Sequence, residues 1–330
     1  MGDRSKIEWV DATWNPVTGC SKITGSPGCS NCYAATFTER WRGTPGHYFA
    51  GGFDVQERKD KVDLPLRWKR PRRVFVNSLS DIGHKAVSEG FLVEVFAVMA
   101  LAPQHTFLIL TKRPGRVRSL LSQVDLADPS AFAGRVAARV SEREGPLIEW
   151  PLPNVWLGTS AENQAWAEVR VPVLLSTPAA VRFVSAEPLL GPLDLSAWLG
   201  SEPGRLQWVI AGGESGHGAR PMHPAWPRAL RDQCAVAGAA FFFKQWGGWR
   251  LVAEDGADPV PHAAAAGLPG GRPCHQVRED GAVEPDPDVR GAGIASMMRV
   301  QMSVAGRELD GRTWDETPPL AARATVRAAR

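Results

Sequence analysis

The chain has 330 residues, of which 44% are apolar, and its formal net charge is +3. This length allows one large domain with a substantial core, or a domain with appendages. The small net charge argues against nucleic-acid binding by the molecule as a whole, so such a role would need local basic patches. Five cysteines, an odd number at uneven spacing, argue against a secreted disulfide framework.

The N-terminal residues and the apolar stretches of the chain indicate the cellular compartment of the protein. Residues Met1–Asp11 are charged and contain no apolar signal core. The longest apolar stretch, Phe91–Ala102, is too short to span a bilayer and contains Glu94. We therefore expect a cytoplasmic protein with no membrane partner, in a compartment where thiols stay reduced and can bind metal.

Three cysteines near the N-terminus have the spacing C-x8-C-x2-C; they are Cys20, Cys29 and Cys32. The last two can face one ion or cluster, and Pro27 and Gly28 provide the bend between the first and second. Three thiolates suit an iron–sulfur cluster or zinc, and on a [4Fe–4S] cluster they leave one iron open to another ligand. A helix expected at Tyr33–Trp41 would begin at the third cysteine, as the first helix of a barrel.

Zinc is the alternative interpretation of the same cysteines. It needs a fourth ligand, for which His47 and His84 are available. Ordinary buried thiols are disfavoured, because three cysteines within 13 residues flanked by Gly and Pro are not a core pattern. In contrast, Cys234 lies in an apolar helical segment and is expected in the core, and Cys274 falls in an expected loop.

The rest of the chain predicts strands alternating with helices. Short apolar runs bounded by turn residues indicate covered parallel strands at Val74–Val76, Phe107–Leu110, Val155–Leu157, Val181–Val184, Trp208–Ile210 and Ala240–Phe243. Helices are expected at Val87–Leu101, Ala161–Leu175 and Trp226–Gly238. This alternation predicts an α/β fold in which residues 1–250 form a partial or full (β/α) barrel, favoured over a flat doubly wound sheet.

Residues 251–330 are expected to form a loop-rich C-terminal extension that packs on the barrel. The segment Ala253–Gly293 is rich in Asp, Pro, Gly and Ala and predicts a long surface loop, followed by a strand within Ile294–Val304.

Each predicted strand of the barrel ends in polar residues, and such ends open onto one face of a parallel barrel. They are Asn77–Asp81, Thr111–Pro114, Gly158–Asn163, Ser185–Pro188, Gly212–Ser215 and Lys244–Trp246. One such end alone is as compatible with a turn or helix cap, but six in series predict a ligand site.

Two basic segments are candidates for contacts with phosphates. Residues Arg67–Arg73 contain five positive charges around Trp68, and Lys112–Arg118 contain four. If both flank the opening of the barrel, they favour an anionic substrate. The alternative is that they are solvated surface.

Several motifs in order resemble a phage- and bacterium-encoded family, the three-cysteine-motif or phage radical-SAM-like proteins. The motifs are Lys6–Trp9, Thr13–Cys20, Cys32–Ala34, Phe75–Ser78, Leu110–Pro114, Asn154–Gly158, Glu187–Pro192, Gly212–Gly216, Ala219–Pro221, Phe243–Gly247 and Leu309–Trp314. The resemblance implies a branch of the radical S-adenosylmethionine (SAM) superfamily with a partial barrel. That superfamily usually has C-x3-C-x2-C, so the first gap is longer here.

The resemblance also implies cofactors and site residues. A [4Fe–4S] cluster would be held by Cys20, Cys29 and Cys32. Residues that would contact SAM, by their place in the strand order, are Asn77, Ser78, Ser80, Asp81, Ser160, Glu162 and Glu187. Candidate catalytic residues are Lys112, Glu214 and Lys244.

The expected function is generation of a 5′-deoxyadenosyl radical that acts on a nucleic acid or nucleotide, in modification or repair. The expected partners are DNA or RNA, a one-electron donor such as flavodoxin or ferredoxin, and a protein that adds specificity. The alternative is a zinc-stabilised nucleic-acid-binding protein without catalysis.

Overall fold

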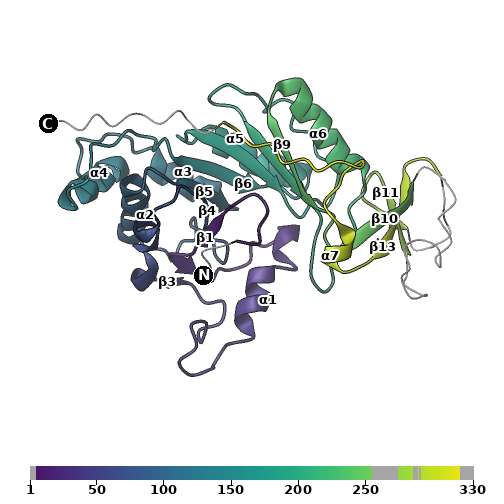
Figure 1. The fold of residues 1–330 in the computed structure, drawn as a ribbon, viewed down its shortest axis with the longest axis horizontal. Coiled ribbons are helices and arrows are strands. Elements are labelled where there is room, and N and C mark those ends of the chain that lie inside the picture. The colour runs from purple at the N-terminus through teal and green to yellow at the C-terminus, as the bar shows by residue number, and fades with distance from the viewer. Residues whose placement is uncertain (1–4, 255–273, 285–288, 290, 320–330) are drawn as a thin grey trace.

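The computed structural model describes residues 5–254, 274–284, 289 and 291–319. Its centre is a seven-stranded sheet that curls into a half-barrel (Figure 1). The strands, in their order across the sheet, are β1 (Ala12–Trp14), β4 (Arg73–Val76), β5 (Thr106–Thr111), β6 (Val155–Ser160), β7 (Val181–Ala186), β8 (Trp208–Gly212) and β9 (Ala240–Gln245). All neighbours are parallel, so all the carboxyl ends meet at one edge.

The structure confirms the partial barrel and all six strands predicted from apolar runs. It adds β1, which pairs with β4 through Ala12 and Val74. That strand has only three residues, so its apolar run is too short to stand out in the sequence.

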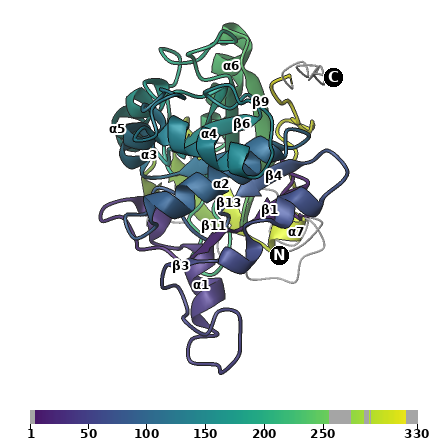
Figure 2. The ribbon, with the colours of Figure 1, turned by 90° about the vertical axis from the view of Figure 1, so that its left-hand side faces the viewer.

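Helices cover the outer face of the sheet (Figure 2). They are α2 (Glu89–Leu101), α3 (Pro114–Leu121), α4 (Phe132–Glu142), α5 (Gln164–Leu175) and α6 (Ala225–Ala237). Three of these were expected, and α6 ends as predicted at Gly238, whose φ of 68° favours glycine. The prediction missed α3 and α4, although Phe132, Val136 and Val140 of α4 are buried at helical spacing.

The two faces of the sheet have different cores. Aliphatic side chains of the outer face pack against the helices. Large aromatic rings fill the inner face. One of them belongs to Trp9, in the segment before β1, and its ring centroid lies 4.7 Å from that of Phe75 and 6.0 Å from that of Trp208. The rings of Trp156, Phe183, Trp208 and Phe242 come from the first half of their strands, so the polar carboxyl ends of these strands are left to build a site.

The first helix departs from the prediction. Helix α1 (Tyr33–Glu39) begins directly after Cys32, as expected, but ends two residues earlier. It projects away from the half-barrel instead of joining the helices that cover the sheet (Figures 1 and 2). The interpretation as a barrel helix was therefore wrong. Short strands β2 (Val17–Thr18) and β3 (Gln56–Glu57) pair near it, and 3₁₀ turns occupy Pro27–Cys29, Lys59–Lys61 and Leu64–Arg67.

Beyond β9, part of the expected loop forms a second, antiparallel sheet. Its strands, in spatial order, are β10 (Trp249–Glu254), β13 (Ile294–Arg299), β11 (Cys274–Arg278) and β12 (Val283–Glu284). Cys274 therefore begins a strand, and the segment expected as one strand ends in helix α7 (Met302–Ala305). The remainder of the expected loop, residues 255–273, 285–288 and 290, lies outside the described residues.

The second sheet shares its core with the outer face of the half-barrel. Val277 and Met297 belong to the same buried cluster as the helices, and Trp226 Nε1 of α6 donates to the carbonyl of Glu279 at 2.7 Å. The chain then returns along the edge of β9, where Phe243 N donates to the carbonyl of Trp314 at 2.9 Å. Within the described part of the chain, no helix is both long and apolar enough to cross a bilayer.

Candidate functional site

The segment from Cys20 to Cys32, called the cysteine loop below, lies across the carboxyl ends of the strands. Its start is held after β4, where Gly19 N donates to the carbonyl of Leu79 at 3.0 Å. Its middle is held by side chains of residues that follow β6 and β8 in the chain. There Trp166 Nε1 donates to the carbonyl of Gly25 at 3.2 Å, and Arg220 Nη2 to that of Pro27 at 2.8 Å. The sheet thus brings the three cysteines to the edge at which the sequence predicts a site.

The three cysteines of the loop are half-buried and form no disulfide with any described residue. Arg113 Nη1, from the end of β5, donates to Cys20 Sγ at 3.3 Å. Burial, together with the charge of Asp81, raises the pKa of the Cys20 thiol to about 11, and Arg113 opposes that rise. Three thiols on one loop, one of them facing a cationic donor, fit an iron–sulfur cluster in their chemistry.

The zinc interpretation requires a fourth ligand close to the thiols. The ring of His47 stacks on Trp41, with centroids 4.1 Å apart, and His84 Nε2 lies 2.8 Å from Ser21 Oγ. Among the residues that the structure describes, no three Cys, His, Asp or Glu side chains are grouped so as to hold a single metal ion. The same holds for the three cysteines of the loop, so the cluster and the zinc set both stay predictions.

Asp81, expected to contact a cofactor, orients Arg113. Its Oδ1 accepts from Thr111 Oγ1 at 2.6 Å and from Gly83 N at 2.8 Å. Its Oδ2 accepts from Lys112 N at 3.0 Å and from Arg113 Nη1 at 3.1 Å. Both carboxylate oxygens are therefore engaged, and the carboxylate directs the guanidinium toward the sulfur of Cys20.

Glu162, also expected to contact a cofactor, anchors the middle of the cysteine loop. Its side chain is fully buried. Oε1 accepts hydrogen bonds from Ser26 Oγ at 3.1 Å and from Lys112 Nζ. Oε2 accepts one from Arg170 Nη1 at 2.8 Å. Burial opposes ionisation, yet Lys112 and Arg170 outweigh it and lower the pKa of this carboxyl. A Cβ on Gly28 would lie 2.4 Å from Oε1, so the close approach requires glycine.

Glu214 anchors the end of the loop in the same way. Its Oε2 accepts from Asn31 Nδ2 at 3.2 Å, next to Cys32, and from Arg220 Nε at 2.8 Å. Burial opposes its ionisation, but hydrogen bonds from Arg220 lower the pKa of the carboxyl. Of the candidate catalytic residues, Glu214 thus holds the cysteine loop directly, and Lys112 pairs with Glu162, which holds it.

Other predicted residues lie at the same edge with different surroundings. Lys244 Nζ and Glu187 Oε1 form an ion pair at 2.6 Å between the ends of β9 and β7, with side chains 16% and 20% exposed. Ser80 Oγ donates to the carbonyl of Val17 at 2.8 Å, and the buried Ser160 accepts at its carbonyl from Arg170 at 2.9 Å. The hydrogen bonds of Ser80 and Ser160 are internal to the chain, whereas the ion pair is partly exposed.

Asn77 stands out among the predicted cofactor residues. It is 2% exposed, with a φ of 62°, and its Oδ1 accepts from Val17 N at 3.3 Å. Its Nδ2 has no hydrogen-bond partner among the described residues. An unsatisfied buried amide is uncommon in folded proteins. Next to it, Ser78 exchanges hydrogen bonds with Asn15.

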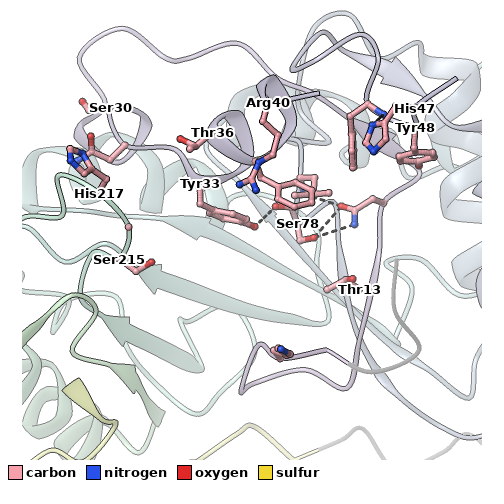
Figure 3. A pocket seen from close by; sticks show the side chains of 17 residues that line it. Thr13, Ser30, Tyr33, Thr36, Arg40, His47, Tyr48, Ser78, Ser215 and His217 are labelled. Atoms are coloured by element: carbon pink, nitrogen blue, oxygen red, sulfur yellow. Dashed lines mark hydrogen bonds between the residues drawn. The ribbon is translucent and has the colours of Figure 1, made fainter. Parts of the chain in front are cut away.

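A cleft of about 1100 Å³ opens beside the cysteine loop (Figure 3). Its walls come from α1 and the segment after it, from the ends of β1 and β4, and from the segment after β8. Tyr33 and Phe37 of α1 line it with side chains 57% and 39% exposed. Sequence reasoning missed both, although their spacing of four on a helix after Cys32 is the signal of a shared face.

A family described as a protein of unknown function, DUF5131, matches residues 4–318. The chain belongs to the DUF5131 family. The match includes the half-barrel, the cysteine loop and the second sheet, so these are parts of one family unit. No curated protein and no solved structure matches the chain.

The two basic segments of this DUF5131 member do not flank one opening, which corrects the prediction. Residues Arg67–Arg73 lead into β4 and so lie at the amino end of the sheet, whereas the cysteine loop crosses the carboxyl ends. In the other segment, Arg113 contacts Asp81 and Cys20, and Arg116 donates to the carbonyls of His84 and Val87. These cations mainly organise the site.

Proposed function

We propose that the chain is a cytoplasmic radical-SAM enzyme that acts on a nucleic acid or nucleotide. In this proposal Cys20, Cys29 and Cys32 hold a [4Fe–4S] cluster. The supporting observation is that the cysteine loop crosses the carboxyl ends of a parallel half-barrel. Carboxylates that follow β6 and β8 bond to the loop, and the one that follows β4 orients Arg113 toward Cys20. When bound, the cluster and SAM supply an electron and a 5′-deoxyadenosyl radical.

The residues of the chain would prepare the site for that chemistry. Arg113 faces the sulfur of Cys20 and offsets the charge of a thiolate. Glu162 and Glu214 fix the loop from two sides, so the thiols keep their positions as metal binds. Packed rings on the inner face of the sheet, with Trp9 and Trp208 both buried, exclude water from beneath the site.

Asn77 and Ser78 are the residues that we assign to the amino acid part of SAM. The unsatisfied Nδ2 of Asn77 is a donor suited to a carboxylate. At the other side of the edge, Lys244 and Glu187 are placed between β9 and β7, where a proton could be held at Nζ. We therefore keep Lys244 as the candidate catalytic residue. A flavodoxin or ferredoxin would supply the electron, and a protein partner could add specificity.

The test is anaerobic purification followed by addition of SAM and a reductant. The expected result is a brown protein with broad absorption near ~400 nm that forms 5′-deoxyadenosine. A Cys29→Ala variant should be colourless and inactive, and Asn77→Ala should keep its iron but bind SAM about 10- to 100-fold more weakly. A colourless parent that holds zinc would contradict the proposal and favour the zinc-stabilised nucleic-acid-binding protein.

A further inference from the structure

The cleft beside the cysteine loop has one wall formed by a single face of α1. Tyr33 and Phe37 of α1 and Arg40, the helical residue directly after it, follow one another at intervals of four and three, so their side chains lie on the same side of the helix. Phe37 packs edge-on against Phe49, with centroids 5.6 Å apart, which fixes its ring at the wall. Arg40 holds its guanidinium 5.0 Å from the centre of the Phe37 ring.

Exposed rings on such a wall are unusual because burial of aromatic surface is favourable. Tyr33 is 57% exposed even though its hydroxyl donates to the carbonyl of Ser78. Its ring is therefore held in place while one side stays open. A flat ring that is fixed and solvent-exposed is a stacking surface for another flat ring.

The charge of the cleft favours an anionic ligand. Lys6 and Arg40 line it and are exposed, with His47 and His217 farther along the wall. Among the described residues that line the cleft, none is Asp or Glu. Hydroxyl and amide groups complete the lining, among them Ser30, Asn31 and Ser215. Stacking rings, cations without opposing carboxylates and small polar groups together match bases, phosphates and base edges.

The geometry points to single-stranded nucleic acid as the ligand of this cleft, with a base stacked on Tyr33 or Phe37 and phosphates near Arg40 and Lys6. A single strand is required because bases in a duplex hide their faces in the stack. A cleft of about 1100 Å³ exceeds the size typical for one small ligand, so it can take more than one nucleotide. This inference rests on the proposed function, because it names the substrate class of that site.

The cleft lies next to the cysteine loop. Ser30 and Asn31 precede Cys32, and Tyr33 follows it, so the cysteine loop itself forms part of the wall. A nucleotide stacked on Tyr33 would thus lie next to the proposed cluster. This arrangement assigns phosphate contact to Arg40, directly after α1, and not to Arg67–Arg73, which lie at the other end of the sheet.

The test is fluorescence anisotropy of labelled dT12 and rU12 oligonucleotides with the full anaerobic chain, without SAM, over a salt series. At least one oligonucleotide should bind, more weakly as salt rises. The Phe37→Leu variant, which keeps the apolar contact with Phe49, should bind about 5- to 100-fold more weakly. Arg40→Glu should weaken binding and flatten the salt dependence, because one phosphate contact is lost.

The matched control is Arg70→Glu, which reverses an exposed charge at the amino end of the sheet and should bind like the parent. The inference is overturned if neither oligonucleotide binds at low salt, if Phe37→Leu and Arg40→Glu bind like the parent, or if Arg70→Glu weakens binding as much as Arg40→Glu. Equally tight binding of a blunt duplex would also overturn it. SAM cleavage without oligonucleotide is measured separately, so loss of the substrate class and loss of radical chemistry give different results.

Discussion

Arg113 and Cys20 are joined by a hydrogen bond of 3.3 Å from Nη1 to Sγ, and the same nitrogen lies 3.1 Å from Oδ2 of Asp81. Hydrogen bonds and positive charge at a cluster sulfur stabilise the reduced, more negative state. In the proposed enzyme, Arg113→Gln should therefore lower the reduction potential of the cluster by on the order of tens of millivolts. Potentiometric titration followed by electron paramagnetic resonance measures this shift.

The control for this prediction is Arg116→Gln. Arg116 belongs to the same basic segment but donates to the carbonyls of His84 and Val87. It should leave the potential near that of the parent. An Arg113→Gln protein with full iron content and an unchanged potential would show that the guanidinium does not act on the cluster.

The cysteine ligands are tested by iron content. Replacing Cys20, Cys29 or Cys32 with Ala should remove most of the iron and the absorption near ~400 nm, because three thiolates are the minimum set for the proposed cluster. Cys234→Ala is the control, because that thiol is fully buried in α6. Iron and sulfide analysis of the anaerobically purified variants measures this loss. Full iron content in the Cys29→Ala variant would refute the ligand assignment.

The buried pair of Glu162 and Arg170 predicts a stability effect. Both side chains are at most 1% exposed, and Oε2 and Nη1 are 2.8 Å apart. Glu162→Gln leaves the guanidinium without its counter-charge and should lower the free energy of unfolding by about 3–5 kcal/mol. Glu168→Gln, an exposed change on α5 near Arg170, is the control and should have little effect. Urea unfolding curves measure both, and equal curves for the two variants would contradict the prediction.

Acid should destabilise the fold through the carboxyls that hold the cysteine loop. The pKa values of Glu162 and Glu214 lie below the ordinary value of 4.5. The ionised forms are therefore favoured in the folded chain, and their contribution to stability is present above that value and lost as the pH falls through the lower, folded-state pKa. Glu214→Gln should show a shallower fall in the free energy of unfolding below about pH 5. An unchanged slope in pH-dependent urea unfolding would exclude Glu214 as a contributor.

Much of the fold could be predicted because its signals are local. Strands such as β6 begin with an apolar run that is buried on both faces, here Val155–Leu157, and helix α6 is followed by a glycine that marks its end in the sequence. The cysteine spacing likewise identified the loop. Short elements escaped, such as β1, since three residues carry too little periodicity to be recognised.

What the polar strand ends do could not be read from the sequence. The rule that parallel strands end at one edge correctly collected Asp81, Glu162 and Glu214, but it could not say what they contact. Ser26 and Glu162 are separated by 136 positions in the sequence, and Asn31 and Glu214 by 183. No periodicity reports pairs so distant, because their contact depends on how the whole sheet curls.

The sequence by itself determined the alternation of strands and helices, the cysteine loop, and the edge of the sheet at which the polar strand ends gather. These follow from local composition and from the common direction of parallel strands. Only the tertiary structure decided that Glu162 and Glu214 hold the loop, that α1 projects away from the half-barrel, and that Tyr33 and Phe37 face an open cleft. The physical reason is that burial and charge pairing are properties of surfaces brought together, which a one-dimensional pattern does not contain.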